Sequence, residues 1–174
     1  IPPHAYDGGL SLGCLEFARI FYDLETMNFE NFPYVQDDSE TTSPTDSMID
    51  DVVNLLAEGK IVAWFQGSGE IGPRALGNRS ILMHPGIPSG KDILNERVKH
   101  REWWRPFAPS VLEECASDWF QINGPSPFML RAVPVLEEKM HKIASVVHKD
   151  GTSRIQTVSE KDNALYYKLI NKFY

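Results

Sequence analysis

The segment 72–80, with the sequence GPRALGNRS, concentrates groups that bind anions. It follows a β-rich run and a glycine-rich turn, where free backbone amides and flexible glycines allow close approach to a phosphate. Arg74, Asn78, Arg79 and Ser80 offer two forked cations, an amide and a hydroxyl, which suit a phosphate or carboxylate. The segment has neither the P-loop nor the GxGxxG pattern. A surface loop with solvated arginines is the alternative interpretation.

The segment 99–110, KHREWWRPFAPS, is the second candidate. On an extended backbone its alternating cations would share one face, where they would repel each other unless they shared an anion. Pro106 and Pro109 favour an edge that lines a cleft. The alternative is three solvated charges around a tryptophan pair, Trp103 and Trp104, that packs into the core. Either tryptophan could equally stack on a base or fill space, and packing is the commoner role for this residue. The candidate residues here are Lys99, Arg101, Arg105, Pro106 and Ser110.

The third candidate is the segment 148–157, HKDGTSRIQT. Its Asp-Gly pair predicts a tight turn after a β-branched run. Beyond the turn, the alternation of side chains along a strand places a hydroxyl, a guanidinium and an amide on one face. Such a row of polar groups can bind a ligand specifically. A lone His148 is more often structural than catalytic. The candidate residues are His148, Asp150, Thr152, Arg154 and Gln156.

Composition excludes several classes of function. The net charge of −7 disfavours a general binder of nucleic acid or anionic membranes. Yet residues 74–105 hold seven of the 17 Lys and Arg and only three acids, which leaves about +4 in that stretch. The chain has two cysteines without CxxC spacing, and it lacks the Ser-His-Asp, HExxH and paired-carboxylate signatures. A local basic focus in an acidic chain indicates a site for a small anion.

Helices and strands intermix along the chain, which predicts an α/β or α+β class with a sheet of several strands covered by helices. Asp7 is expected to cap a helix that begins near Gly9, and Ser47 with Asp50 a helix that ends before Gly59. Further helices are expected at 89–100, capped by Ser89, and at 113–120 and 163–173. Strands are expected at 60–66, 80–83, 107–112, 129–136, 144–148 and 154–158.

Four motifs together resemble the C-terminal part of the carbamoyltransferase family, which includes nodulation-factor and antibiotic O-carbamoyltransferases. They are GEIGPRALGNRSIL (69–82), KHREWWRPFAPSVLEE (99–114), SPFML (126–130) and VVHKDGTSRIQTV (146–158). The resemblance implies a YrdC-like twisted mixed sheet with flanking helices, preceded by one helix of an actin/hexokinase-like domain. It divides the chain into the tail of an N-terminal carbamoyl-transfer domain (1–26), an acidic linker (27–46) and a carbamoyl-activating domain (47–174) that is truncated at its C-terminus.

The same resemblance implies an activity. ATP with Mg²⁺ and carbamoyl phosphate would give carbamoyl-adenylate, pyrophosphate and phosphate, and the N-terminal domain would pass the carbamoyl group to a substrate hydroxyl. Lys99, Arg101 and Arg105 would act on the phosphates. Arg74, Asn78, Arg79, Ser80, Pro106 and Ser110 would line the same cleft, and residues 148–156 would hold the nucleotide.

The implied partners are ATP, carbamoyl phosphate and the protein's own N-terminal domain, in a cytoplasmic protein without membrane contact. The metal of the N-terminal domain, expected to be iron, is not expected to bind this chain. A homodimer is left open, and an RNA-binding role is disfavoured by the charge. The alternative function is a module that binds nucleotide and carbamoyl phosphate but is inactive without the N-terminal domain.

Overall fold

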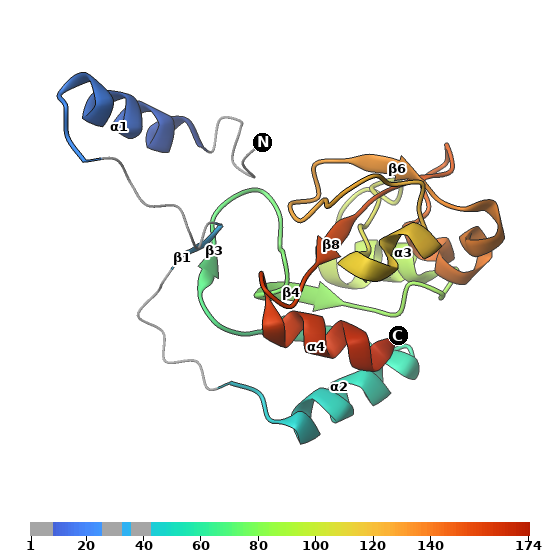
Figure 1. Ribbon diagram of the computed structural model, residues 1–174. Helices are drawn as coiled ribbons and strands as arrows, with labels where there is room; N and C mark the ends of the chain where they lie inside the picture. The colour runs from blue at the N-terminus through green and yellow to red at the C-terminus, as the bar shows by residue number, and fades with distance from the viewer. Residues whose placement is uncertain (1–8, 26–32, 36–42) are drawn as a thin grey trace.

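The computed structural model describes residues 9–25, 33–35 and 43–174. Helices alternate with short strands, so the expected mixed class, α+β, is confirmed (Figure 1). The α-helices are α1 (Leu10–Phe21), α2 (Asp46–Ala57), α3 (Gly90–Leu94) and α4 (Ala164–Phe173). A π-helical turn, η2 (Asn95–Lys99), continues α3, and two 3₁₀ segments are η3 (Glu113–Asp118) and η4 (Glu137–Val146).

The strands pair two by two. They are β1 (Tyr34–Val35), β2 (Val62–Phe65), β3 (Gly69–Glu70), β4 (Arg79–Leu82), β5 (Ser110–Leu112), β6 (Ala132–Pro134), β7 (Thr152–Arg154) and β8 (Gln156–Val158). The pairs β1–β3, β2–β4 and β6–β7 are antiparallel, and β5–β8 is parallel. Within the described residues the sheet is therefore divided into four two-stranded pieces, less continuous than the sequence led us to expect.

Two apolar clusters hold these pieces together. One surrounds β5, β6 and the two 3₁₀ segments, with Phe120 and Ile155 at 3% and 0% exposure. The other joins α2, β2, β8 and α4 through Ile49, Trp64 and Leu169. Burying each such side chain contributes roughly 1.5–3 kcal/mol. Because β8 supplies Val158 to the second cluster and directly follows Ile155 of the first, this strand connects both halves of the core.

The caps of two predicted helices differ from the expectation. Helix α2 begins at Asp46 and its cap is Thr45, whose hydroxyl accepts from the Met48 amide at 3.3 Å, so the prediction of Ser47 was wrong. Thr45 is the N-cap because its backbone is extended, which is the conformation that an N-cap residue adopts. Ser89 does stand at the start of α3, but its side chain makes no capping hydrogen bond. The expected C-terminal glycine, Gly59, has φ of +78°.

The predicted strand at 144–148 was wrong, because most of it belongs to η4. Met140, Ile143 and Val146 recur every third residue, and η4 is kinked at Ile143, where the backbone is non-helical with φ of −127° and ψ of 37°. All three side chains nevertheless lie on one side of the segment, against the same apolar cluster. This packing outweighs the local β preference of two adjacent valines. The predicted strand at 154–158 is confirmed with a break at Ile155, since β7 and β8 pair with different partners.

Helix α1 has no buried residue and stands apart from the main body in Figure 1. Its predicted cap, Asp7, and most of the expected linker at 27–46 lie outside the described residues. Among the helices of the described part, none combines the length and apolarity that crossing a bilayer requires.

Candidate functional site

Three arginines from three separate segments converge near β7. Arg154 lies at the end of β7, Arg74 in the glycine-rich segment, and Arg101 just after η2. Burial lowers the pKa of the Arg154 guanidinium, and the positive charges of Arg74 and Arg101 lower that pKa further. Because the charges of both Arg74 and Arg101 act on Arg154, the fold brings the three sequence segments together around β7. We call Arg74, Arg101 and Arg154 the arginine cluster.

The arginine cluster has donors without acceptors. Among the residues that the structure describes, none of the three forms an ion pair with a carboxylate. The Nε atoms of Arg74 and Arg154 are buried and have no hydrogen-bond partner there. Like charges held near one another without ion-pair partners disfavour the folded state, and an anion that accepts from their forked donors would relieve this.

Arg101 is held in position by its neighbours. Its Nε donates to Asn95 Oδ1 at 2.8 Å, and its guanidinium lies 4.7 Å from the centre of the Phe107 ring. One terminal nitrogen donates to the Pro106 carbonyl at 3.4 Å. Burial is the main cause of its lowered pKa, followed by the charge of Arg105. The side chain is therefore oriented before any ligand arrives.

The prediction that Lys99, Arg101 and Arg105 share one face of an extended strand was wrong. Residue Lys99 ends η2, and Arg105 closes a turn by donating its amide to the Glu102 carbonyl at 3.2 Å. The Asn95 side-chain amide donates to the carbonyls of residues 103 and 105. These two bonds take the place of the backbone hydrogen bonds that a neighbouring strand would supply. Lys99 is exposed, and Arg105 lies 3.6 Å from the carboxylate of Glu102.

The glycine-rich segment turns most of its predicted ligand-binding groups inward. Asn78 is buried, with its Oδ1 accepting from Gln66 and Asn163 at 3.0 and 2.9 Å. Arg79 donates to the carbonyls of Gln66, Gly67 and Asn78, and its guanidinium lies over the Phe65 ring. These groups hold the turn between β2 and β4 together. Their predicted contact with a ligand stays a prediction.

The backbone amides that sequence reasoning offered to a phosphate are occupied by a carboxylate of the chain itself. Glu70 on β3 accepts from the amides of Leu76, Asn78 and Arg79 at 2.7, 3.0 and 3.1 Å. The Ser80 hydroxyl similarly accepts from the Gly77 amide at 3.0 Å. Charge-assisted bonds of this kind are strong, so the loop is preorganised by Glu70 rather than open to an anion at these amides.

A chain of hydrogen bonds ties α4 to the strands behind the arginine cluster. Tyr166 donates to Ser110 Oγ at 2.9 Å, Ser110 donates to Gln156 Oε1 at 2.9 Å, and Gln156 Nε2 donates to the Leu76 carbonyl at 2.9 Å. Burial raises the pKa of Tyr166 to about 12, so the phenol stays protonated and can donate at neutral pH. Ser110 and Gln156 thus support the site from within the fold.

The turn at 148–152 fixes the state of its histidine. Thr152 donates its hydroxyl proton to Asp150 Oδ1 at 2.7 Å, and Oγ1 of Thr152 lies 3.1 Å from His148 Nδ1. Because the Thr152 hydroxyl donates its only proton to Asp150, Nδ1 of the histidine carries the hydrogen of the second bond. The Nε2 atom is then unprotonated and can only accept. The Nε2 atom is buried without a partner among the described residues. Burial lowers the pKa of His148, which keeps the ring neutral at pH 7.

The described part of the chain also contains a pocket of about 710 Å³. Two predicted site residues, Asn78 and Gln156, line it, whereas none of the three arginines does. Its walls include Tyr34, Gln66 and Asn163. These three side chains are hydrogen-bonded in series, since Gln66 donates to Asn163 and Asn163 donates to Tyr34. The pocket is polar but not strongly cationic, so the arginine cluster is the better candidate for binding an anion.

Sequence reasoning missed four residues that build the site: Tyr34, Glu70, Asn95 and Asn163. Asn163 caps α4 by accepting from the Tyr166 amide at 3.1 Å, and it also accepts from Gln66 Nε2 at 2.7 Å. Its position before an apolar helical run was the one signal available. The residues next to Glu70 and Asn95 give no signal, because the partners of both side chains lie six to ten positions further along the chain, at the far side of a turn. In the described part, no group of three metal-binding side chains occurs.

The arrangement of these motifs agrees with a comparison to known families. The sequence model described as "Carbamoyltransferase C-terminus" matches residues 53–174, which include every candidate residue above. This chain belongs to that carbamoyltransferase family. The family membership that the four motifs predicted is thereby confirmed.

Relatives of this carbamoyltransferase C-terminus occur in bacteria and archaea. "Nodulation protein NolNO" of Sinorhizobium fredii is 50% identical over 121 residues, which are 68% of this chain and 18% of the relative. "Nodulation protein NolO" of Bradyrhizobium diazoefficiens is 46% identical over 132 residues, 74% of this chain and 24% of the relative. An uncharacterized protein of Methanocaldococcus jannaschii is 31% identical over 190 residues, covering 100% of this chain and 37% of the relative. The chain spans about a fifth of the length of the first two relatives.

Proposed function

We propose that this chain is the carbamoyl-activating part of an O-carbamoyltransferase. In the proposed reaction, water cleaves carbamoyl phosphate to carbamate and phosphate. A carbamate oxygen then attacks the α-phosphorus of ATP, which forms the carbamoyl-adenylate and expels pyrophosphate. A separate domain would transfer the carbamoyl group to a substrate hydroxyl, releasing AMP. Family membership supports carbamoyl transfer in general, and the ATP-dependent step is the finer part of the proposal.

The arginine cluster is the observation that carries this proposal. Both phosphate-bearing substrates are polyanions, and attack by one anion on another requires charge neutralisation and alignment more than a protein nucleophile. Three convergent guanidinium groups without carboxylate partners in the described part supply that chemistry. ATP would bring Mg²⁺ with it. Exposed Lys99 and Arg105 lie on the segment that flanks Arg101 and extend the positive field around it.

Titration calorimetry of ATP and of carbamoyl phosphate into the 174-residue chain tests the proposal. Arg154→Gln should weaken both affinities by roughly 10- to 100-fold, as expected for the loss of a charge-assisted contact. Arg97→Gln, the same charge change at an exposed residue of η2, is the control and should leave both affinities within about twofold. Equal affinities for Arg154→Gln and the unsubstituted chain would refute the site.

The second candidate function is a binding module that holds both substrates without turning them over. In this alternative the arginine cluster binds both phosphate-bearing substrates, and the bond-forming step requires a separate domain. Release of pyrophosphate from ATP, dependent on carbamoyl phosphate, distinguishes the two candidates. Release by the chain alone supports activation within it. Binding without release supports the module.

A further inference from the structure

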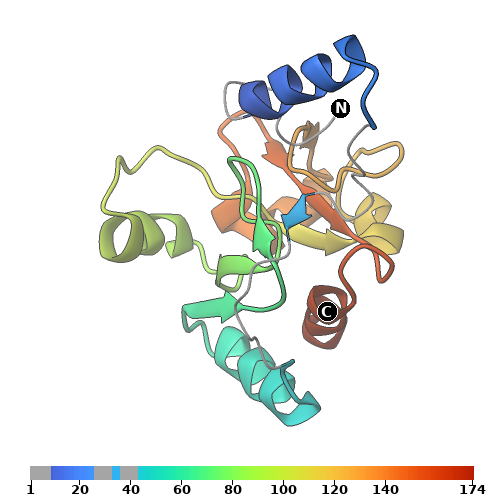
Figure 2. The same cartoon turned by 90° about the vertical axis from the view of Figure 1, so that its left-hand side faces the viewer.

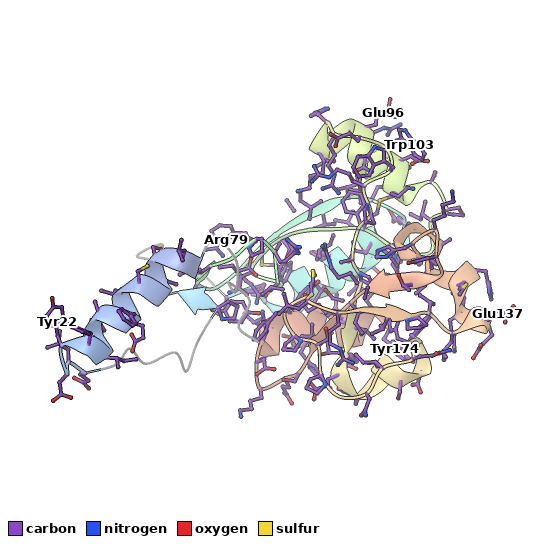
Figure 3. The ribbon with its side chains drawn as sticks, turned by 90° about the horizontal axis from the view of Figure 1, so that it is seen from above. Tyr22, Arg79, Glu96, Trp103, Glu137 and Tyr174 are labelled. Carbon is purple, nitrogen blue, oxygen red and sulfur yellow. The ribbon has the colours of Figure 1, made fainter. Side chains whose placement is uncertain are left out.

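Two adjacent tryptophans on the segment after η2 are exposed, although tryptophan is usually well buried. Trp103 and Trp104 are 72% and 60% exposed, whereas Trp64 in the core is 6% exposed. Figure 3 shows Trp103 on the same lobe as Glu96, at the outer part of the molecule. In Figure 2 the yellow-green segment with α3 and η2 protrudes from the body. The tryptophan pair therefore does not fill space in the described core.

The backbone that carries these rings is held firmly. Asn95, only 1% exposed, donates to the carbonyls of Trp103 and Arg105 at 3.3 and 3.0 Å. Its Oδ1 accepts from Arg101, so one buried side chain fixes three alternate residues. The π-helical turn before them and the left-handed His100, with φ of +46°, are features that concentrate at functional sites. The exposure is thus imposed by a defined local structure.

Trp103 differs from its neighbour in having a cation at its ring. The ammonium of Lys91 lies 5.7 Å from the ring centre. Trp103 is also two residues from Arg101 of the arginine cluster. An aromatic face beside cations matches a ligand that has both a flat π-system and negative charge. A purely apolar protein surface would match the ring but not the ammonium of Lys91 beside it.

We propose that Trp103 is the stacking platform for the purine base of the nucleotide whose phosphates reach the arginine cluster. This inference rests on the proposed function, because it takes the anion at that cluster to be a nucleotide. The base lies on the ring of Trp103 beside the ammonium of Lys91, and the phosphates extend toward Arg101, two residues away in the sequence. Trp104, which carries the same ring at the next position, does not contact the base.

Calorimetry with ATP and with inorganic tripolyphosphate, which has the phosphates but no base, tests the inference on the full chain. ATP should bind more tightly than tripolyphosphate. Trp103→Leu should weaken ATP roughly 10-fold, since a stacked base contributes about 5- to 100-fold to affinity, and should leave tripolyphosphate unchanged. Trp104→Leu is the matched control and should leave both affinities unchanged. Trp103→Phe should retain part of the ATP affinity, which a merely structural loss would not explain.

Three results would overturn the inference. One is equal affinity of the unsubstituted chain for ATP and tripolyphosphate. Another is a loss of ATP affinity in Trp104→Leu alone. A third is unchanged ATP binding by Trp103→Leu, even if that variant alters self-association and so indicates a protein partner at the ring. If tripolyphosphate binding depends on Arg154 and Trp103→Leu has no effect, this inference fails and the proposed function stands. If neither ligand binds, both fail.

Discussion

The two arginine-bearing regions of this chain use the same side chain in opposite ways. In the glycine-rich segment, Arg79 donates to three backbone carbonyls and lies over the Phe65 ring. In the arginine cluster, Arg154 has a buried Nε without a partner among the described residues, and its pKa is lowered by burial first and then by the charges of Arg74 and Arg101. The first arginine stabilises the fold, and the second is held at an electrostatic cost.

The difference shows that a basic motif is not a binding site until the partners of its donors are known. The segment 72–80 contains both kinds of arginine only five positions apart. Arg79 follows a turn whose amides are already bound by Glu70, so its side chain folds back on β2. Arg74 precedes that turn; it donates to the Pro73 carbonyl at 3.1 Å, and its positive charge acts on Arg154. The predictions below separate stabilising groups from binding groups.

The largest effect is expected at the glycine that lets the inward-facing segment approach α4. A Cβ added at Gly77 would lie 2.3 Å from the ring of buried Tyr166, and φ of +111° disfavours any side chain. Gly77→Ala should therefore lower the free energy of unfolding by about 3 kcal/mol or more, measured by urea denaturation. Gly124→Ala is the control.

Gly124 also has positive φ, +74°, but open space around its Cβ position. Its alanine variant should lose only about 1 kcal/mol, from backbone strain alone. Equal losses in Gly77→Ala and Gly124→Ala would show that the packing of segment 72–80 against Tyr166 is not what holds it.

Removing the inward-facing arginine should reduce stability next most. Arg79→Ala deletes the bonds to the carbonyls of residues 66, 67 and 78, and leaves part-buried acceptors without a partner. We expect a loss of about 1–3 kcal/mol in the free energy of unfolding. A variant as stable as the unsubstituted chain would contradict the structural role of Arg79.

Arg154→Gln should produce the opposite pattern. It breaks no ion pair within the described residues and relieves the repulsion from Arg74 and Arg101. Its free energy of unfolding should stay within about 0.5 kcal/mol or rise, even though the substitution lowers substrate affinity. A loss of stability as large as that of Arg79→Ala would erase the contrast between the two regions.

The smallest effect is a pH dependence at His148. Burial lowers its pKa from the ordinary 6.5, so the unfolded chain binds a proton more readily than the folded chain. The stability from this residue is present above pH 6.5 and is lost as the pH falls below that value. His148→Gln should flatten the decline in unfolding free energy between pH 6.5 and 5. His141→Gln, at an exposed position of η4, should leave the decline unchanged.

Elements with strong local patterns could be predicted from the sequence. The helix of residues 164–173 has an asparagine cap and buried positions Tyr166 and Leu169 three apart, and β2 and β4 are short β-rich runs beside turns. The strand at 144–148 failed because a three-residue apolar period packed into the core as 3₁₀ helix. The extended basic strand failed because Asn95, distant in sequence by eight to ten residues, supplied its hydrogen bonds.

The sequence by itself determined the family, the mixed class and the three segments that carry the polar chemistry. These follow from residue types and spacing, which are properties of short stretches. Only the tertiary structure decided that Arg74, Arg101 and Arg154 meet and that Asn78, Arg79 and Gln156 turn inward. A donor's role depends on which acceptors the folded chain brings to it, and those acceptors lie up to 129 positions away.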